Sequence, residues 1–197
     1  LGRMPSPGRE LVGVDLSREM ARLAKGRLGR GAEVVVADAA HLPFRDEVFN
    51  YVYSIRTLIF VPRGEKERAI REMVRVLKPG CPLTLIECCV EGVENLNRLR
   101  RKLKIHNRIP AHRHLFFNVP DLEGEVRRSH IKISGRIYFP IISILEKVFY
   151  PRVSHVRGAT RLLSTLCSII YYADRHLCGL FPVLGHDLVY VGVKLPC

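Results

Sequence analysis

Residues 10–20 decide the fold, and they read ELVGVDLSREM. The apolar run from Leu11 to Val14 stops at Asp15, a pattern that is typical of a buried parallel strand. Ser17 then fits the N-cap of a helix, because apolar residues follow it at helical spacing, at Met20, Leu23 and Ala24. The stretch therefore predicts a strand that ends on an acid and leads directly into a helix.

The same alternation continues downstream. Further strands are expected at Glu33–Ala37, Phe49–Ile55 and Leu83–Glu87. The segment Glu65–Leu77 has apolar residues along one helical face and charged residues on the others, and Lys78-Pro79-Gly80 ends it. Strands that alternate with helices in this way predict an α/β fold with a mostly parallel sheet.

The character of the chain changes after Glu87. Residues 95–119 contain Lys and Arg but no acid, with leucines interleaved. A short helix at Pro120–Arg127, a strand at Ile131–Phe139 and a closing strand at Leu188–Lys194 are expected. Between the last two strands, residues 140–186 are mainly apolar and predicted helical. Because no repeat or low-complexity linker interrupts the chain, we expect a single domain over residues 1–197.

Amino-acid composition narrows the classes of partner that the protein is expected to bind. There are 32 Lys and Arg residues against 19 Asp and Glu, a net charge of +13, which favours an anionic partner or else indicates a basic surface without one. The six cysteines fit neither a zinc knuckle nor a disulfide framework, so we expect reduced core thiols in a cytoplasmic protein. The longest apolar stretch, Leu162–Ala173, is too short to span a bilayer.

Two acids form the candidate binding constellation. Asp15 and Asp38 each follow the end of a predicted parallel strand, and ligands of such sheets bind at the carboxyl ends of the strands. One carboxylate can accept hydrogen bonds from both hydroxyls of a ribose, and the other can reach an adenine amino group. Leu16 and Met20 would pack on the adenine face. The alternative is that both acids are ordinary loop or helix-cap residues.

The landmarks, taken in order, resemble those of class I S-adenosylmethionine-dependent methyltransferases. Residues 10–20 look like the second strand and following helix of that family, and ADAAHLPF at 37–44, followed by FNYVYS at 49–54, resembles the next two landmarks. RVLKPG at 75–80 before a strand is the most recognisable. The resemblance implies a Rossmann-like sheet with an antiparallel last strand, and residues 1–89 as the cofactor-binding half.

The resemblance also assigns site residues. It implies that Asp15 holds the ribose hydroxyls of S-adenosyl-L-methionine and that Asp38 meets the adenine amino group, with the backbone of Ala39 against the ring. Ser54 and Ile55 would lie near the methionine portion and the reactive methyl group.

One departure from the family pattern is serious. The family's first strand and its glycine-rich loop should precede Leu11, and Gly2, Gly8 and Gly13 do not form such a loop. The predicted sheet therefore lacks the usual first strand and half of the cofactor site. We expect that the sequence is part of a longer protein.

No catalytic base can be named from the sequence. Four histidines are candidates: His41, His112, His114 and His186. Each could act as a general base, and the alternative for each is an ordinary surface or hydrogen-bonded histidine. No Cys or carboxylate near His112 and His114 completes a metal site, so no metal is expected.

Two segments outside the predicted parallel strands indicate which class of molecule accepts the methyl group. The basic segment, 90–130, and the helical insert, 140–186, should overhang the cofactor crevice, the insert as a substrate cap. We therefore expect a small-molecule acceptor, lipophilic or acidic. The other expected partners are an anionic membrane surface and a second copy of the chain, bound through the insert. Nucleic acid ranks lower, because no aromatic residues for base stacking are interleaved with the basic residues.

Two other functions remain open at the level of sequence. A methyltransferase-like domain without the glycine-rich loop can serve as a binding or membrane-surface module that performs no catalysis. A nicotinamide-dependent oxidoreductase also ends its second strand in an acid, but the LPF at 42–44 and the RVLKPG at 75–80 argue against it.

Overall fold

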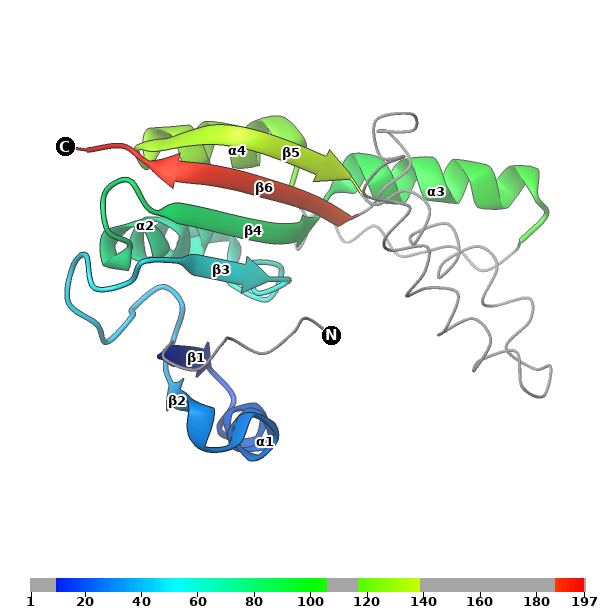
Figure 1. The fold of residues 1–197 in the computed structure, drawn as a ribbon. Helices are drawn as coiled ribbons and strands as arrows, with labels where there is room; N and C mark the ends of the chain where they lie inside the picture. Colours follow the sequence, from blue (N-terminus) through cyan, green and yellow to red (C-terminus); the bar gives the residue numbers. More distant parts are fainter. Residues whose placement is uncertain (1–9, 106–116, 139–186, 197) are drawn as a thin grey trace.

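The computed structural model describes residues 10–105, 117–138 and 187–196 (Figure 1). The strands are β1 (Leu11–Asp15), β2 (Ala32–Val36), β3 (Val52–Ile55), β4 (Pro82–Cys88), β5 (Ile131–Tyr138) and β6 (Asp187–Lys194). The α-helices are α1 (Arg18–Leu28), α2 (Lys66–Val76), α3 (Val90–Lys102) and α4 (Val119–Arg128). Short 3₁₀ turns, η1 (Gly29–Gly31) and η2 (Arg63–Glu65), follow α1 and precede α2.

The strands form two sheets. β1 and β2 pair in parallel, and the second sheet has the order β3-β4-β6-β5. β3 and β4 are parallel, whereas β6 runs antiparallel to both β4 and β5, so the predicted antiparallel last strand is confirmed. Within the described residues no strand lies between β1 and β3, and the split falls where the family's first strand is expected (Figure 1).

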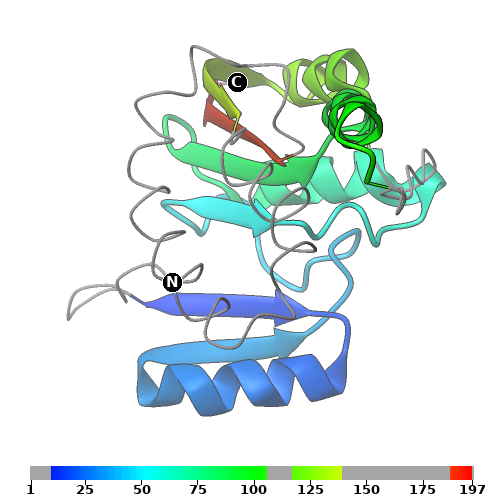
Figure 2. The ribbon, with the colours of Figure 1, turned by 90° about the vertical axis from the view of Figure 1, so that its right-hand side faces the viewer.

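The larger sheet carries the core. α2 and α4 lie together on one of its faces, and their apolar residues pack against β4 and β6 (Figure 2). Ile70, Leu77, Leu83, Leu85 and Tyr190 are at most 2% exposed. Each such side chain contributes roughly 1.5–3 kcal/mol by leaving water.

Arg75 ties the loop after β2 to α2. Its guanidinium donates to the carbonyls of Leu42 (3.0 Å) and Phe44 (2.8 Å) and pairs with Asp46 (2.6 Å) and Glu72 (2.7 Å). Glu72 in turn accepts the Leu42 N–H at 2.8 Å. Arg75 of the RVLKPG landmark therefore fixes the LPF landmark in place through these hydrogen bonds, which explains why the two landmarks occur together.

The predicted elements are all found where the structure describes them, with two differences. β3 begins at Val52, because Phe49 leaves the strand to bridge Leu77 and packs edge-on against Phe44, with ring centroids 5.1 Å apart. The basic segment begins with a helix, α3, that its charge pattern did not reveal. The predicted insert at 140–186 lies outside the described residues. None of the described helices is long and apolar enough to cross a membrane.

Candidate nucleoside site at the strand ends

The loops that follow β2 and β3 meet at the carboxyl ends of the strands. Ala40 from the first loop and Leu58 from the second are both fully buried in one cluster, together with Val61. Farther along, ligand atoms of Asp38, His41 and Glu65 lie within 4.8 Å of one another. The edge carrying the two predicted acids is therefore continuous with the edge formed by β3 and β4.

Asp15 ends β1 and is half-buried. Its Oδ1 accepts the Ser17 N–H at 2.9 Å, and Ser17 Oγ caps α1 by accepting the Met20 N–H at 3.3 Å. No other described residue bonds to the Asp15 carboxylate. Leu16 and Met20 beside it are 72% and 53% exposed. An acid with acceptor capacity left over, flanked by exposed apolar side chains, suits a ribose and the base attached to it.

Asp38 lies just beyond β2, next to Asp15, since the Ala37 N–H donates to the Asp15 carbonyl at 3.1 Å. Its Oδ1 accepts the Ala40 N–H at 2.8 Å, and its Oδ2 is 3.5 Å from Nδ1 of the exposed His41. Ala39 packs against the core cluster. Asp38 is thus well placed for an adenine edge, although His41 shares one of its oxygens.

Glu65 joins Asp38 and His41 in a group that is able to hold a metal ion. Sequence reasoning did not foresee this group, because Glu65 is distant in the chain. Two of the three members are partly buried and one is exposed. Exposed acids often gather in this way without an ion, and the Asp38 oxygens already have the partners described above. His112, His114 and His186 lie outside the described residues.

Ser54 and Ile55 end β3 in different ways. Ile55 is 56% exposed at the edge, whereas Ser54 is 5% exposed and its hydroxyl lies 3.5 Å from Glu87 Oε1. Only the backbone of Ser54 is therefore available to a ligand at the edge. The apolar exposure continues in Tyr53, at 51%, and Phe60, at 79%.

Glu87 was not predicted as a site residue, yet among the described acids its pKa is shifted the most. It lies in β4, is 1% exposed, and accepts the Leu58 N–H through Oε1 at 3.1 Å. Burial raises the pKa of Glu87 to about 7, against the opposing effects of the Leu58, Thr57 and Ile59 N–H groups and of the Lys66 charge. The signal in the sequence was an acid inside the apolar strand LTLIECC at 83–89.

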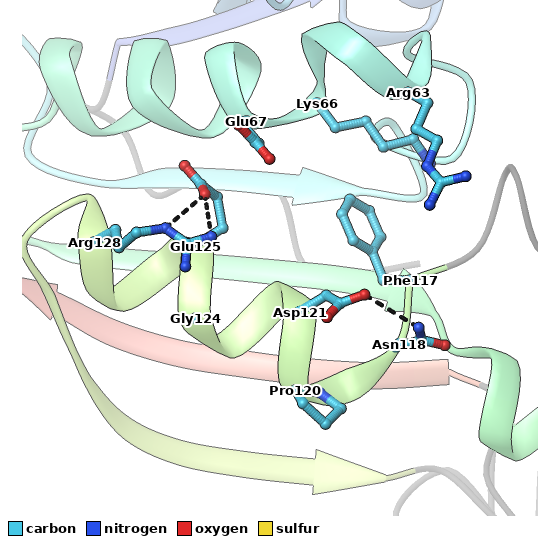
Figure 3. A pocket seen from close by; sticks show the side chains of 10 residues that line it. All are labelled: Arg63, Lys66, Glu67, Phe117, Asn118, Pro120, Asp121, Gly124, Glu125 and Arg128. Atoms are coloured by element: carbon cyan, nitrogen blue, oxygen red, sulfur yellow. Dashed lines mark hydrogen bonds and ion pairs between the residues drawn. The ribbon is translucent and has the colours of Figure 1, made fainter.

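A separate hollow of about 340 Å³ lies between α2 and α4 (Figure 3). Its lining includes both charge signs, and Arg128 is already paired with Glu125 at 2.7 Å. The Lys66 ammonium lies 4.5 Å from the centroid of the Phe117 ring. Lys66 is only 5% exposed, and desolvation lowers its pKa while the negative charge of Glu87 raises it.

The predicted site residues thus lie at the carboxyl ends of the strands of an α/β fold, where ligands of such folds bind, and comparison with known proteins narrows the class of protein. Residues 2–85 match the family model described as "Methyltransferase domain". The "Probable tRNA methyltransferase 9B" of Homo sapiens is 33% identical over 133 residues, which cover 66% of this chain and 28% of that protein. The "Ubiquinone/menaquinone biosynthesis C-methyltransferase UbiE" of Pseudomonas putida is 39% identical over 92 residues, which cover 43% of this chain and 34% of that protein.

A solved structure agrees in fold. The phosphoethanolamine N-methyltransferase 2 of Haemonchus contortus in complex with S-adenosyl-L-methionine has a TM-score of 0.61 at 16% identity, over 94% of this chain and 43% of that chain. Residues 2–85 thus match the methyltransferase-domain family, and the fold of the chain resembles that of a solved methyltransferase with bound S-adenosyl-L-methionine. The chain spans about a third of the length of the curated relatives it matches.

Proposed function

We propose that the protein transfers a methyl group from S-adenosyl-L-methionine to a small molecule that is lipophilic or acidic. The observation that carries this proposal is Asp15, an acid with spare acceptor capacity at the end of β1, inside the segment that matches the methyltransferase family. The exposed Leu16 and Met20 beside it give a nucleoside an apolar surface to lie on.

Each residue has a role in this proposal. Asp15 accepts hydrogen bonds from the ribose hydroxyls, and Asp38 accepts one from the adenine amino group, with the Ala39 backbone against the ring. The backbone at Ser54 and the exposed Ile55 border the methionine portion. The bound cofactor supplies an electrophilic methyl group, so the protein has mainly to orient the acceptor and exclude water.

Charge and the relatives' names support the acceptor class. Exposed basic residues cluster at the end of α3, at Arg98, Arg101, Lys102 and Lys104. Cations in such a cluster attract anionic groups. Two of the matched proteins are named for a quinone and for a phosphorylated amine, one lipophilic and one anionic.

A second candidate acceptor is tRNA. The match to the probable tRNA methyltransferase 9B is the longer of the two sequence matches given above and covers 66% of this chain. The same basic cluster on α3 is able to contact phosphates, which supply most of the affinity of proteins for nucleic acids. Stacking side chains interleaved with these charges would strengthen this candidate, and residues 98–104 contain no aromatic residue.

The decisive experiment measures S-adenosylhomocysteine formed from S-adenosyl-L-methionine with three acceptor pools: quinones and other isoprenoid lipids, phosphorylated amines, and tRNA. We expect turnover with a lipid or phosphorylated amine, and a raised KM for S-adenosyl-L-methionine in Asp15→Ala. Glu33→Ala is the matched control, since Glu33 is an exposed acid on the neighbouring β2 that pairs with Lys25. Turnover with tRNA alone would make tRNA the acceptor in place of a small molecule. Turnover with none of the three pools would contradict the proposal.

A further inference from the structure

The loop after β3 is built around the carboxylate of Glu87. The chain turns sharply at Arg56, whose φ is 51°, a left-handed conformation that non-glycine residues rarely adopt. The Arg56 N–H still continues the ladder by donating to the Ile86 carbonyl at 2.7 Å. After this turn the N–H groups of Thr57, Leu58 and Ile59 all favour the ionised form of Glu87. Of these three amides, the Leu58 N–H makes a hydrogen bond to the carboxylate, at 3.1 Å from Oε1.

Leu58 packs loop 56–60 into the core, and residues before and after Leu58 in the chain are exposed to solvent. Leu58, whose amide donates to Glu87, is fully buried in the core cluster. Ile55 and Phe60 on either side of it are 56% and 79% exposed. Glu87 therefore fixes the inner side of a loop whose outer side borders the site where the reactive end of the cofactor is proposed to lie.

The arrangement is not one that core packing alone would select. Glu87 Oε2 is buried with no hydrogen-bond partner among the described residues, and native proteins leave few buried polar atoms in this condition. The Ser54 hydroxyl from β3 is at the outer limit of hydrogen bonding, 3.5 Å from Oε1. The charged group that faces Glu87 from α2 is Lys66.

We propose that Glu87 is a positioning residue, whose ionised carboxylate holds loop 56–60 and thereby the cofactor-facing Ile55 in place. The inference rests on the proposed function for the identity of the ligand, but the contact between Glu87 and the loop stands on the structure alone. Ionised oxygens accept stronger hydrogen bonds from backbone amides than neutral ones do, so deprotonation tightens the loop. A proton on Oε2 leaves Oε1 as a weaker acceptor and loosens it.

This mechanism gives the loop a dependence on pH. Burial raises the pKa of Glu87 to about 7, whereas the loop amides lower it, so among folded conformations that keep Glu87 buried the loop tightens as the pH rises through neutrality. Global unfolding, which exposes Glu87 to water, becomes easier over the same pH range. Lys66 favours the ionised form, so Lys66→Met moves the midpoint of the loop tightening to higher pH. Glu87→Gln, which keeps an oxygen acceptor but has no charge to gain, removes the dependence.

Amide hydrogen exchange at pH 6 and pH 8 tests the contact in the full chain. We expect the protection factor of the Leu58 amide to rise with pH in the wild type, and to fall by about tenfold at pH 8 in Glu87→Gln, as expected when a charge-assisted hydrogen bond becomes neutral. Glu72→Gln is the matched control: Glu72 accepts a different loop amide, that of Leu42, so this variant deprotects Leu42 and leaves Leu58 unchanged. Equal protection and equal pH dependence in the wild type and Glu87→Gln would overturn the proposal.

Calorimetry with S-adenosyl-L-methionine at the same two pH values tests the consequence for the site. We expect several-fold tighter binding at pH 8 than at pH 6 in the wild type, and equal binding at both in Glu87→Gln. A change in loop protection without any change in affinity overturns the positioning role. A wild type that binds no cofactor at either pH contradicts the proposed function, while the protection factors still decide whether Glu87 holds the loop.

Discussion

The two sheets of this protein differ in what they bury. In the unit formed by β1, α1 and β2, Ala21 and Ala32 are the buried apolar residues, while Val14, Met20 and Val36 are 36% to 53% exposed. In the four-stranded sheet, Leu83 and Leu85 are at most 2% exposed, beneath α2 and α4. The half that carries Glu87 therefore contains most of the described buried core, and the half that carries Asp15 is the one that we propose recognises the cofactor.

This contrast has a physical cause. Strands of a parallel sheet are usually covered on both faces, and two strands alone make a marginal sheet. β1 has β2 as its one strand partner among the described residues, and β3 has β4 as its one strand partner there. The loops after β2 and β3 nevertheless join the two units through Ala40 and Leu58. The position of the site thus depends more on these loops than on a continuous ladder.

The largest expected effect is a core truncation in the four-stranded half. Ile70→Ala should lower the free energy of unfolding by about 2–5 kcal/mol, because Ile70 is fully buried and its removal leaves a cavity. The matched change on β1, Val14→Ala, should cost less than about 1 kcal/mol, since Val14 is 36% exposed. Urea denaturation of both variants measures the difference, and equal losses would contradict the division of roles.

Glu87 should make stability depend on pH with a definite sign. Its pKa is about 7 in the folded state and 4.5 as the reference value, so the folded state binds the proton more tightly. The stabilisation is complete below pH 4.5 and is lost as the pH rises to 7, a change of about 3 kcal/mol. Relative to Glu87→Gln, the wild type should lose stability over this window in urea titrations. A constant difference between the two proteins from pH 4.5 to 8 would rule out the raised pKa.

The Arg75 contacts should come next in size. Arg75→Met removes the donors to the Leu42 and Phe44 carbonyls and the ion pair of the half-buried Glu72, which should cost about 1–3 kcal/mol. Arg68→Met, on the same helix but at an exposed position, should change stability by less than about 0.5 kcal/mol. Thermal unfolding measures both, and similar values for the two variants would show that the Arg75 contacts contribute little.

Much of this architecture could be predicted from local patterns. The runs that end at Asp15 and Asp38 indicated parallel strands, and the apolar face of Glu65–Leu77 indicated the helix that covers the four-stranded sheet. The Pro-Gly at the end of that helix is explained by Gly80, whose φ of 74° suits glycine. These features depend on residues that are close in sequence, so periodicity and turn chemistry were enough to predict them.

The rest depends on contacts between distant residues. Arg75 bonds a loop about thirty residues upstream, and Glu87 bonds a loop after the preceding strand, distances at which no periodicity applies. α3 was not predicted, because the residues after Glu87 were interpreted by their charge, and the burial of Arg100, which is 4% exposed, depends on tertiary packing. Glu87 was detectable in principle as an acid in an apolar strand, but its role required knowing where the Leu58 amide lies.

The central claim is that Asp15 holds the ribose of S-adenosyl-L-methionine, and isothermal titration calorimetry of the cofactor tests it most directly. Asp15→Ala should weaken binding by roughly tenfold to a hundredfold, the range for losing hydrogen bonds to a charged group. Glu33→Ala, the exposed control on β2, should bind as the wild type does. Unchanged affinity in Asp15→Ala would contradict the ribose assignment.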